Sequence, residues 1–143
     1  MSVEQVHHLR KTFALVERHP EVAALVFYQE LFLIDPSLRV LFREDISGQA
    51  RKLMEMLGAA LRLLDEPARL VPILEELGLR HAAYGVLPEH YPIVRQALIA
   101  MLRQTLHDEL TPAALAAWSD LYDLIEVSML RGAAKAGVVM ERL

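Results

Sequence analysis

The stretch ELGLRHAAYGVLPEHYP, residues 76–92, places a histidine on the apolar face of a helix. Positions at helical spacing from His81 are Leu77, Leu74 and Leu70 before it and Tyr84 after it. The same spacing therefore predicts that the imidazole faces the interior of a helical protein. A polar ring at such a position needs a partner, and the identity of that partner decides how the chain is interpreted.

Around this stretch, hydrophobic periodicity and helix punctuation predict six to eight helices and no strand. The expected segments run from Ser2 to about Glu17, from Pro20 to near Leu33, from Pro36 to Phe42, from a cap at Ser47 to about Leu64, from Asp65 to Gly85, from about Pro88 to His107, and from Thr111 into the 130s. Ser2 with Gln5 resembles a capping box. Pro72 either kinks the fifth segment or marks its start, and the residues from Gly137 onward are expected to fray.

Size and composition predict one all-α domain over residues 1–143, with its core at about residues 2–135. The apolar fraction of 54% also suits a chain that encloses something apolar besides itself. A net charge of −4 and a pI of about 5.8 give no basic field, so nucleic acid and membrane are not expected as partners. The absence of cysteine excludes disulfides and thiolate sites, and no signal peptide or membrane span is readable, so a cytoplasmic protein is expected.

Two further polar residues interrupt apolar helical faces in the way His81 does. Tyr28 has at helical spacing Ala24, Leu25, Leu31 and Phe32. Gln49 has Ile46, Leu53, Met56 and Leu57. Both are therefore expected to be at least partly buried, and a buried polar group without a partner costs roughly 1–3 kcal/mol.

Each of the three also has an ordinary structural explanation. His81 fits a hydrogen-bonded core histidine, and Tyr28 fits a core ring whose hydroxyl binds a backbone carbonyl. Gln49, near a helix N-terminus, fits a solvated or capping amide as well as a ligand-facing one. Together, however, they offer one imidazole and two hydrogen-bond donors from three helices, which would converge on a common cavity.

Four stretches carry a family resemblance in combination. They are FYQELFLIDP (27–36) continuing into LF (41–42), ISGQARKL (46–53), LGLRHAAYGV (77–86) and HYPIV (90–94). Over residues from about 5 to 130, the chain resembles bacterial single-domain globins and the haem domain of flavohaemoglobins. The resemblance implies a globin fold of six to eight helices packed around a haem pocket.

The resemblance also implies roles for particular residues. His81 matches the proximal ligand of the iron of haem b, and Tyr28 and Gln49 match the distal hydrogen-bond donors to O2 bound on ferrous iron. Residues that match the lining of the pocket are Phe42, Leu53, Leu57, Leu77, Val86, Tyr91 and Val94. Lys52 matches a partner of a haem propionate, although an exposed helix lysine explains it equally well.

One departure from the family concerns the proximal side. In flavohaemoglobins, a tyrosine matching Tyr91 and a glutamate late in the last helix support the proximal imidazole. Here the acid is missing from the late turn after Trp118, and Glu126 lies about a turn or more too early. Peroxidase-like activation of bound oxygen is therefore not expected with the same support.

The resemblance implies O2, NO and other small haem ligands as partners. Conversion of nitric oxide to nitrate would follow the family, but it needs electrons from a separate reductase, so catalysis is left open. The alternatives are oxygen carriage, storage or scavenging without turnover, and haem-based sensing. A haem-free helical interaction module is the remaining explanation.

Overall fold

The computed structural model describes residues 1–42 and 46–142, with side chains described as far as residue 135. Six α-helices and three short 3-10 helices make up this part of the chain, and it contains no strand. In chain order the elements are α1 (Val3–Val16), α2 (Pro20–Ile34), η1 (Pro36–Leu41), α3 (Ile46–Arg62), α4 (Pro67–Ala83), η2 (Pro88–His90), α5 (Tyr91–Leu106), η3 (His107–Glu109) and α6 (Pro112–Arg142). The prediction of an all-α fold is confirmed.

Local signals account for several helix ends. The Ser2 hydroxyl accepts from the backbone N–H of Gln5 at 3.1 Å, and the Gln5 side chain accepts from the Ser2 N–H at 3.0 Å, which is the predicted capping box. Asp35 caps η1 by accepting from the Ser37 N–H at 3.0 Å. Gly85, at φ +99°, supplies the left-handed turn that follows α4.

Two details of the predicted segments are resolved or corrected. Ser47 lies inside α3, which begins at Ile46, so it is not the residue that precedes the helix. Pro72 lies inside α4 and does not mark its start. The helix begins at Pro67, and at this first position the N–H that proline lacks is not needed. The last helix continues through the 130s, as expected, and reaches Arg142. The fraying expected from Gly137 onward stays a prediction, because the side chains there lie outside the described residues.

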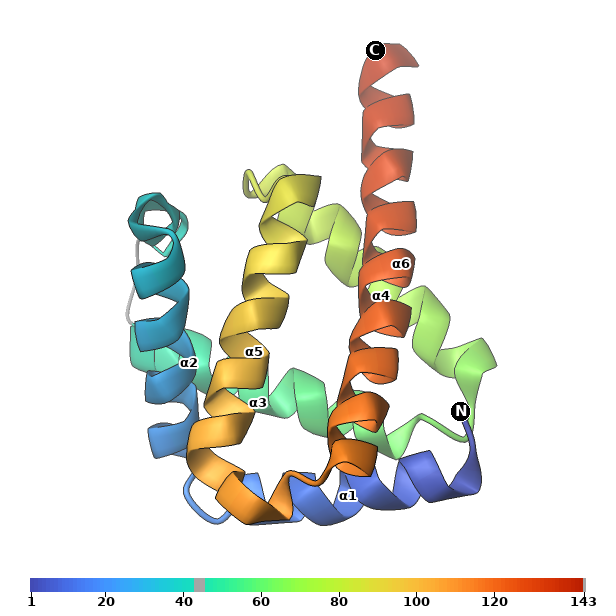
Figure 1. The fold of residues 1–143 in the computed structure, drawn as a ribbon. Coiled ribbons are helices and arrows are strands. Elements are labelled where there is room, and N and C mark those ends of the chain that lie inside the picture. Colours follow the sequence, from blue (N-terminus) through green and yellow to red (C-terminus); the bar gives the residue numbers. More distant parts are fainter. Residues whose placement is uncertain (43–45, 143) are drawn as a thin grey trace.

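Helix packing joins the elements into two main pairings. α4 crosses α6, while α2 packs against α5, α3 and η1, and α1 supports α6, α5 and α3 (Figure 1). At the contact between α1 and α6 the fully buried Trp118 donates its indole N–H to the Thr12 hydroxyl at 2.9 Å. That hydroxyl in turn donates to the His8 carbonyl at 2.7 Å, so the buried polar groups are paired.

Two glycines let the backbones of α4 and α6 approach closely. A Cβ atom added at Gly78 would lie 1.9 Å from the Met129 carbonyl oxygen, and one at Gly132 would lie 1.8 Å from the Glu75 carbonyl oxygen. Lys135 and Glu75 form an ion pair of 3.0 Å across the same crossing. Only glycine fits these two positions. The close crossing therefore fixes the position of α4 against α6.

Two residues assigned to apolar faces are exposed instead. Tyr84 has 76% of its surface exposed because it lies beyond Ala83, the last residue of α4, where helical spacing no longer applies. Leu25 is 53% exposed, because the buried face of α2 is formed by Ala23, Ala24, Phe27, Tyr28 and Leu31. Within the part of the chain that the structure covers, no helix is both long and apolar enough to cross a membrane.

Candidate functional site

His81 lies in the last turn of α4, where its side chain is half-buried. Its Nδ1 atom lies 2.8 Å from the Leu77 carbonyl oxygen. A carbonyl only accepts hydrogen bonds, so Nδ1 carries the proton and Nε2 keeps a free lone pair. Burial lowers the pKa of His81, with a smaller effect of the Arg80 charge in the same direction, while the bond to Leu77 opposes the shift. The ring is therefore neutral at pH 7 and its Nε2 is available as a ligand.

Tyr28 is buried in α2, with only 5% of its surface exposed. Burial raises the pKa of its phenol to about 12, so it remains a neutral O–H donor. That hydroxyl makes no hydrogen bond to any described residue. No buried side-chain oxygen or nitrogen in the described chain is both unpaired and sealed from water. The Tyr28 hydroxyl must therefore border a space that a water molecule can reach, unlike the core tyrosine of the ordinary explanation.

Phe42 and Gln49 come from the segments on either side of residues 43–45. Phe42 follows η1 and its half-buried ring lies 5.2 Å from the ring of Tyr28 at 73°. Gln49 lies in the first turns of α3, is half-buried, and has no hydrogen-bond partner among the residues described. In the same helix Leu53 is half-buried and Leu57 is buried, whereas Lys52 is exposed.

The remaining predicted residues lie near His81 in the sequence, between Leu77 and Val94. Leu77, Val86 and Val94 are half-buried, and the Val86 N–H donates to the His81 carbonyl at 3.0 Å. Tyr91 is buried at the start of α5. In the described part of the chain, its hydroxyl has no hydrogen bond to His81. The imidazole is held by the carbonyl of Leu77 instead.

Sequence reasoning missed two side chains that fix Tyr91. The Tyr122 hydroxyl donates to the Tyr91 carbonyl, and the Arg95 guanidinium lies 4.5 Å from the centre of the Tyr122 ring. Burial raises the pKa of Tyr91, and the negative charge of Glu126 raises it further. Glu126 thus acts on Tyr91 by charge, although no described hydrogen bond joins them. The spacing of Tyr122 from Trp118, four residues along one helix, was the available signal.

The helix that carries His81 is not packed against those that carry Tyr28 and Gln49. α4 has its main contact with α6, and neither α2 nor α3 shares an extensive backbone contact with it. Among the described residues, the two sides approach each other where Leu41 lies beside Gly85, just after the end of α4. Apolar residues that keep part of their surface exposed come from both sides: Phe42, Leu53, Leu77, Val86 and Val94. This arrangement suits a flat apolar group between α4 and the α2–α3 side.

The donor set also bears on which metal group would fit. The described residues contain no cluster of three or more His, Cys, Asp or Glu that could hold a metal ion. A metal bound at His81 would therefore need its other ligands from a group that brings its own donors. A porphyrin is such a group, because it supplies four nitrogens and leaves one position for a neutral imidazole.

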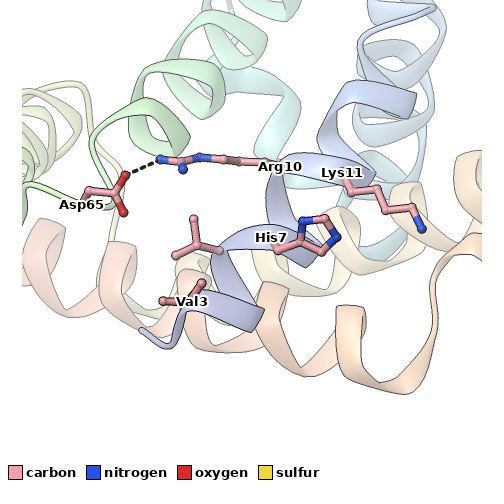
Figure 2. Close-up of a pocket in the computed structure, with 6 residues that line it drawn as sticks. Val3, His7, Arg10, Lys11 and Asp65 are labelled. Atoms are coloured by element: carbon pink, nitrogen blue, oxygen red, sulfur yellow. Dashed lines mark hydrogen bonds and ion pairs between the residues drawn. The ribbon is translucent and has the colours of Figure 1, made fainter.

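A separate surface hollow of about 310 Å³ lies beside α1 (Figure 2). It is lined by Val3, Val6, His7, Arg10, Lys11 and Asp65. Arg10 bridges it by donating to the Asp65 carboxylate at 2.9 Å and to the Leu61 carbonyl at 3.2 Å. These bonds tie α1 to the end of α3 and the connection that follows, so the hollow is a feature of helix packing distinct from the residues around His81.

Comparisons with known proteins agree with this arrangement. The sequence profile of the globin family matches residues 25–129, more than half of the chain. The flavohemoprotein of Chromobacterium violaceum is 30% identical over 134 residues, which are 91% of this chain and 33% of that protein. The flavohemoprotein of Bacillus subtilis is 29% identical over 122 residues, 82% of this chain and 30% of that protein. The chain thus spans about a third of the length of these relatives.

Solved structures extend the likeness to the whole fold. An engineered carbene transferase, described as a candidate nitric oxide dioxygenase from Rhodothermus marinus, is 26% identical with a TM-score of 0.87, and 99% of each chain is covered. A hexacoordinated haem protein of a tardigrade has a TM-score of 0.85 at 18% identity, covering 94% of this chain and 96% of its own, and shows the same fold. The globin and flavohemoprotein relatives imply a haem cofactor. On its sequence and its all-α architecture, the chain belongs to the globin family.

Proposed function

We propose that the chain holds haem b between α4 and the α2–α3 side, with His81 as the protein ligand of the iron. When bound, the haem iron supplies the position at which O2, NO and other small molecules bind. Membership of the globin family supports the cofactor, and the partial exposure of apolar residues on both sides supports its place. The proposal makes this chain an oxygen-binding haem protein.

The observation that carries the proposal is the hydrogen bond between the Nδ1 atom of His81 and the Leu77 carbonyl. This bond fixes both the tautomer and the direction of the ring, and it makes Nε2 more basic. A histidine that serves only as a core residue gains nothing from keeping Nε2 unpaired. A metal ligand requires that nitrogen to be free.

Tyr28 and Gln49 would act as donors on the opposite side. A hydrogen bond to a partly charged acceptor contributes about 1.5–3 kcal/mol, which slows ligand release by roughly 10- to 150-fold. Tyr28 suits this role because burial keeps its pKa at about 12, so its hydroxyl stays protonated at any physiological pH. Its lack of a partner in the described chain leaves the hydroxyl free to donate.

The other predicted residues would enclose the cofactor. Phe42 and Leu53 would cover it on the distal side together with Leu57. Leu77, Val86, Val94 and Tyr91 would cover it on the proximal side and exclude water from the iron. Lys52, being exposed, is suited to pair with a propionate at the edge of the group.

A second candidate function is conversion of nitric oxide to nitrate with bound oxygen. The likeness to the Rhodothermus marinus protein over 99% of both chains favours it. Electrons for turnover would come from a separate reductase, and the protein would work in the cytoplasm. Tight oxygen binding through Tyr28 favours this activity over oxygen carriage or storage, which need faster release.

Titration with haemin tests the cofactor assignment. The wild-type chain is expected to give a Soret band with a 1:1 end point, and His81→Gly is expected to lose the wild-type spectrum and regain it with added imidazole. His90→Ala is the matched control, because the described contact of the His90 side chain is a hydrogen bond that it accepts from the Leu87 N–H. A wild-type spectrum from His81→Gly without imidazole would disprove the ligand assignment.

Nitric oxide consumption in the presence of a reductant tests turnover. The rate of the wild-type protein is compared with that of Tyr28→Phe.

A further inference from the structure

We propose that Phe32 is a positioning residue for the distal site. Its ring, with those of Phe42 and Phe27, holds the Tyr28 phenol in the one orientation that directs the hydroxyl at a haem-bound ligand. The inference rests on the proposed function and assigns a role to a residue outside the haem contacts predicted above.

Three aromatic rings lie around the ring of Tyr28. Phe32 lies one helical turn after Tyr28, and the two rings are stacked at 26° with centroids 6.1 Å apart. Phe42 meets both of them edge-on, at 5.2 Å from Tyr28 and 5.6 Å from Phe32. Phe27 meets Tyr28 edge-on at 5.1 Å. We expect these three neighbours to restrict any swing of the Tyr28 phenol about its Cα–Cβ bond.

Phe32 is itself held from outside. The Arg39 guanidinium, on η1, lies 5.2 Å from the centre of the Phe32 ring. Phe32 therefore contacts a cation from η1 as well as the Tyr28 ring. η1 is in turn fixed by its cap at Asp35. The position of the Tyr28 phenol is thus linked to η1 through Phe32.

Ring packing matters here because the hydroxyl has no anchor of its own. A buried tyrosine usually has its hydroxyl held by a hydrogen bond, as Tyr122 has through the Tyr91 carbonyl. The Tyr28 hydroxyl has no such bond to any described residue, so the orientation of the donor depends on the rings around it. Phe32 is only half-buried, which means that the core can tolerate its substitution better than that of Phe27.

The test compares Phe32→Leu and Phe32→Tyr with Tyr28→Phe in the haem-loaded protein. The C–O stretching frequency of the ferrous carbon monoxide form reports whether a donor lies against the bound ligand. We expect Tyr28→Phe to raise that frequency, Phe32→Leu to produce a second band near the Tyr28→Phe position, and Phe32→Tyr to keep the single wild-type band. Release of O2 from Phe32→Leu should quicken on the order of 3- to 10-fold, because the hydrogen bond is lost in part of the population.

Phe13→Leu is the matched control, because Phe13 is a core ring that contacts Trp118 and lies on α1, which has no extensive contact with α2. It should lower stability without moving the stretching frequency. A wild-type spectrum from Phe32→Leu beside a shifted Tyr28→Phe would overturn the inference and leave the proposed function standing. An unshifted Tyr28→Phe would overturn the donor role of Tyr28 and the inference with it. If Phe32→Leu binds no haem, Phe32→Met, which retains volume without the ring, decides on the same criteria.

Discussion

Replacement of Gly78 by alanine tests the close crossing of α4 and α6. The new Cβ would lie 1.9 Å from the carbonyl oxygen of Met129, whereas an ordinary contact begins at 3.4 Å. The two helices must therefore separate by about 1.5 Å at this point. The neighbouring atom belongs to the backbone, so no side-chain rotation can relieve the contact.

The expected loss of stability follows from two opposing terms. Overpacking of a tight contact costs about 1–3 kcal/mol, and a backbone neighbour places Gly78→Ala at the upper end of that range. Alanine is favoured over glycine within a helix by about 1 kcal/mol. The net result is a loss of about 2 kcal/mol in the free energy of unfolding, or a fall in Tm of roughly 4–8 °C.

Urea unfolding followed by circular dichroism measures this difference, with Gly48→Ala as the control. Gly48 also lies in a helix, but a Cβ there meets no atom within 4 Å, so its replacement should stabilise the protein by up to about 1 kcal/mol. Gly78 precedes His81 by one turn, so Gly78→Ala should also change the ferrous haem spectrum. Equal stabilisation by the two replacements would refute the reasoning.

Two other predictions concern buried polar groups. Thr12→Val removes the acceptor of the Trp118 indole N–H and should lower the free energy of unfolding, measured by denaturant titration, by about 1–3 kcal/mol. Thr12→Ser keeps a hydroxyl and should retain most of the wild-type stability. Equal stability of the two variants would contradict this prediction. Burial raises the pKa of Tyr28 to about 12, above its value in the unfolded chain. The contribution of Tyr28 to the free energy of unfolding is therefore constant below about pH 10 and falls as the pH rises towards 12. The total loss is up to about 2–3 kcal/mol. Tyr28→Phe should therefore show a shallower fall in Tm over that range, and parallel curves for the two proteins would count against it.

Helix positions and the partial burial of His81 were readable because they depend on local signals. Capping by Ser2 and Gln5, the start at Pro67 and the turn at Gly85 each act within a few residues of sequence. The failures are also local. The helical spacing around His81 was extended one residue beyond the end of α4, to Tyr84. The helix cap predicted at Ser47 lies inside α3.

Features that depend on the pairing of distant helices were not readable in this way. The need for glycine at residue 78 appears only when Met129 is brought against it, 51 residues along the chain. The anchoring of Tyr91 by Tyr122 likewise needs α5 to lie beside α6. For the site itself, the resemblance named residues. The hydrogen bond from His81 to Leu77, and the absence of a described partner for the Tyr28 hydroxyl, came from the structure.

The two sides of the proposed site are supported by different parts of the fold. His81 lies on α4, which is held mainly by α6 through the glycine crossing, whereas Tyr28 is held by aromatic rings of α2 and the end of η1 and by the packing of α2 on α5. α4 has little contact with α2 or α3. The distance between His81 and the Tyr28 hydroxyl therefore depends on the packing of α5, α6 and α1, which connect the two sides. We therefore expect a substitution on one side to have little effect on the other. If the proposed site is correct, substitutions around Phe32 should change ligand release and leave the proposed bond between His81 and the haem intact.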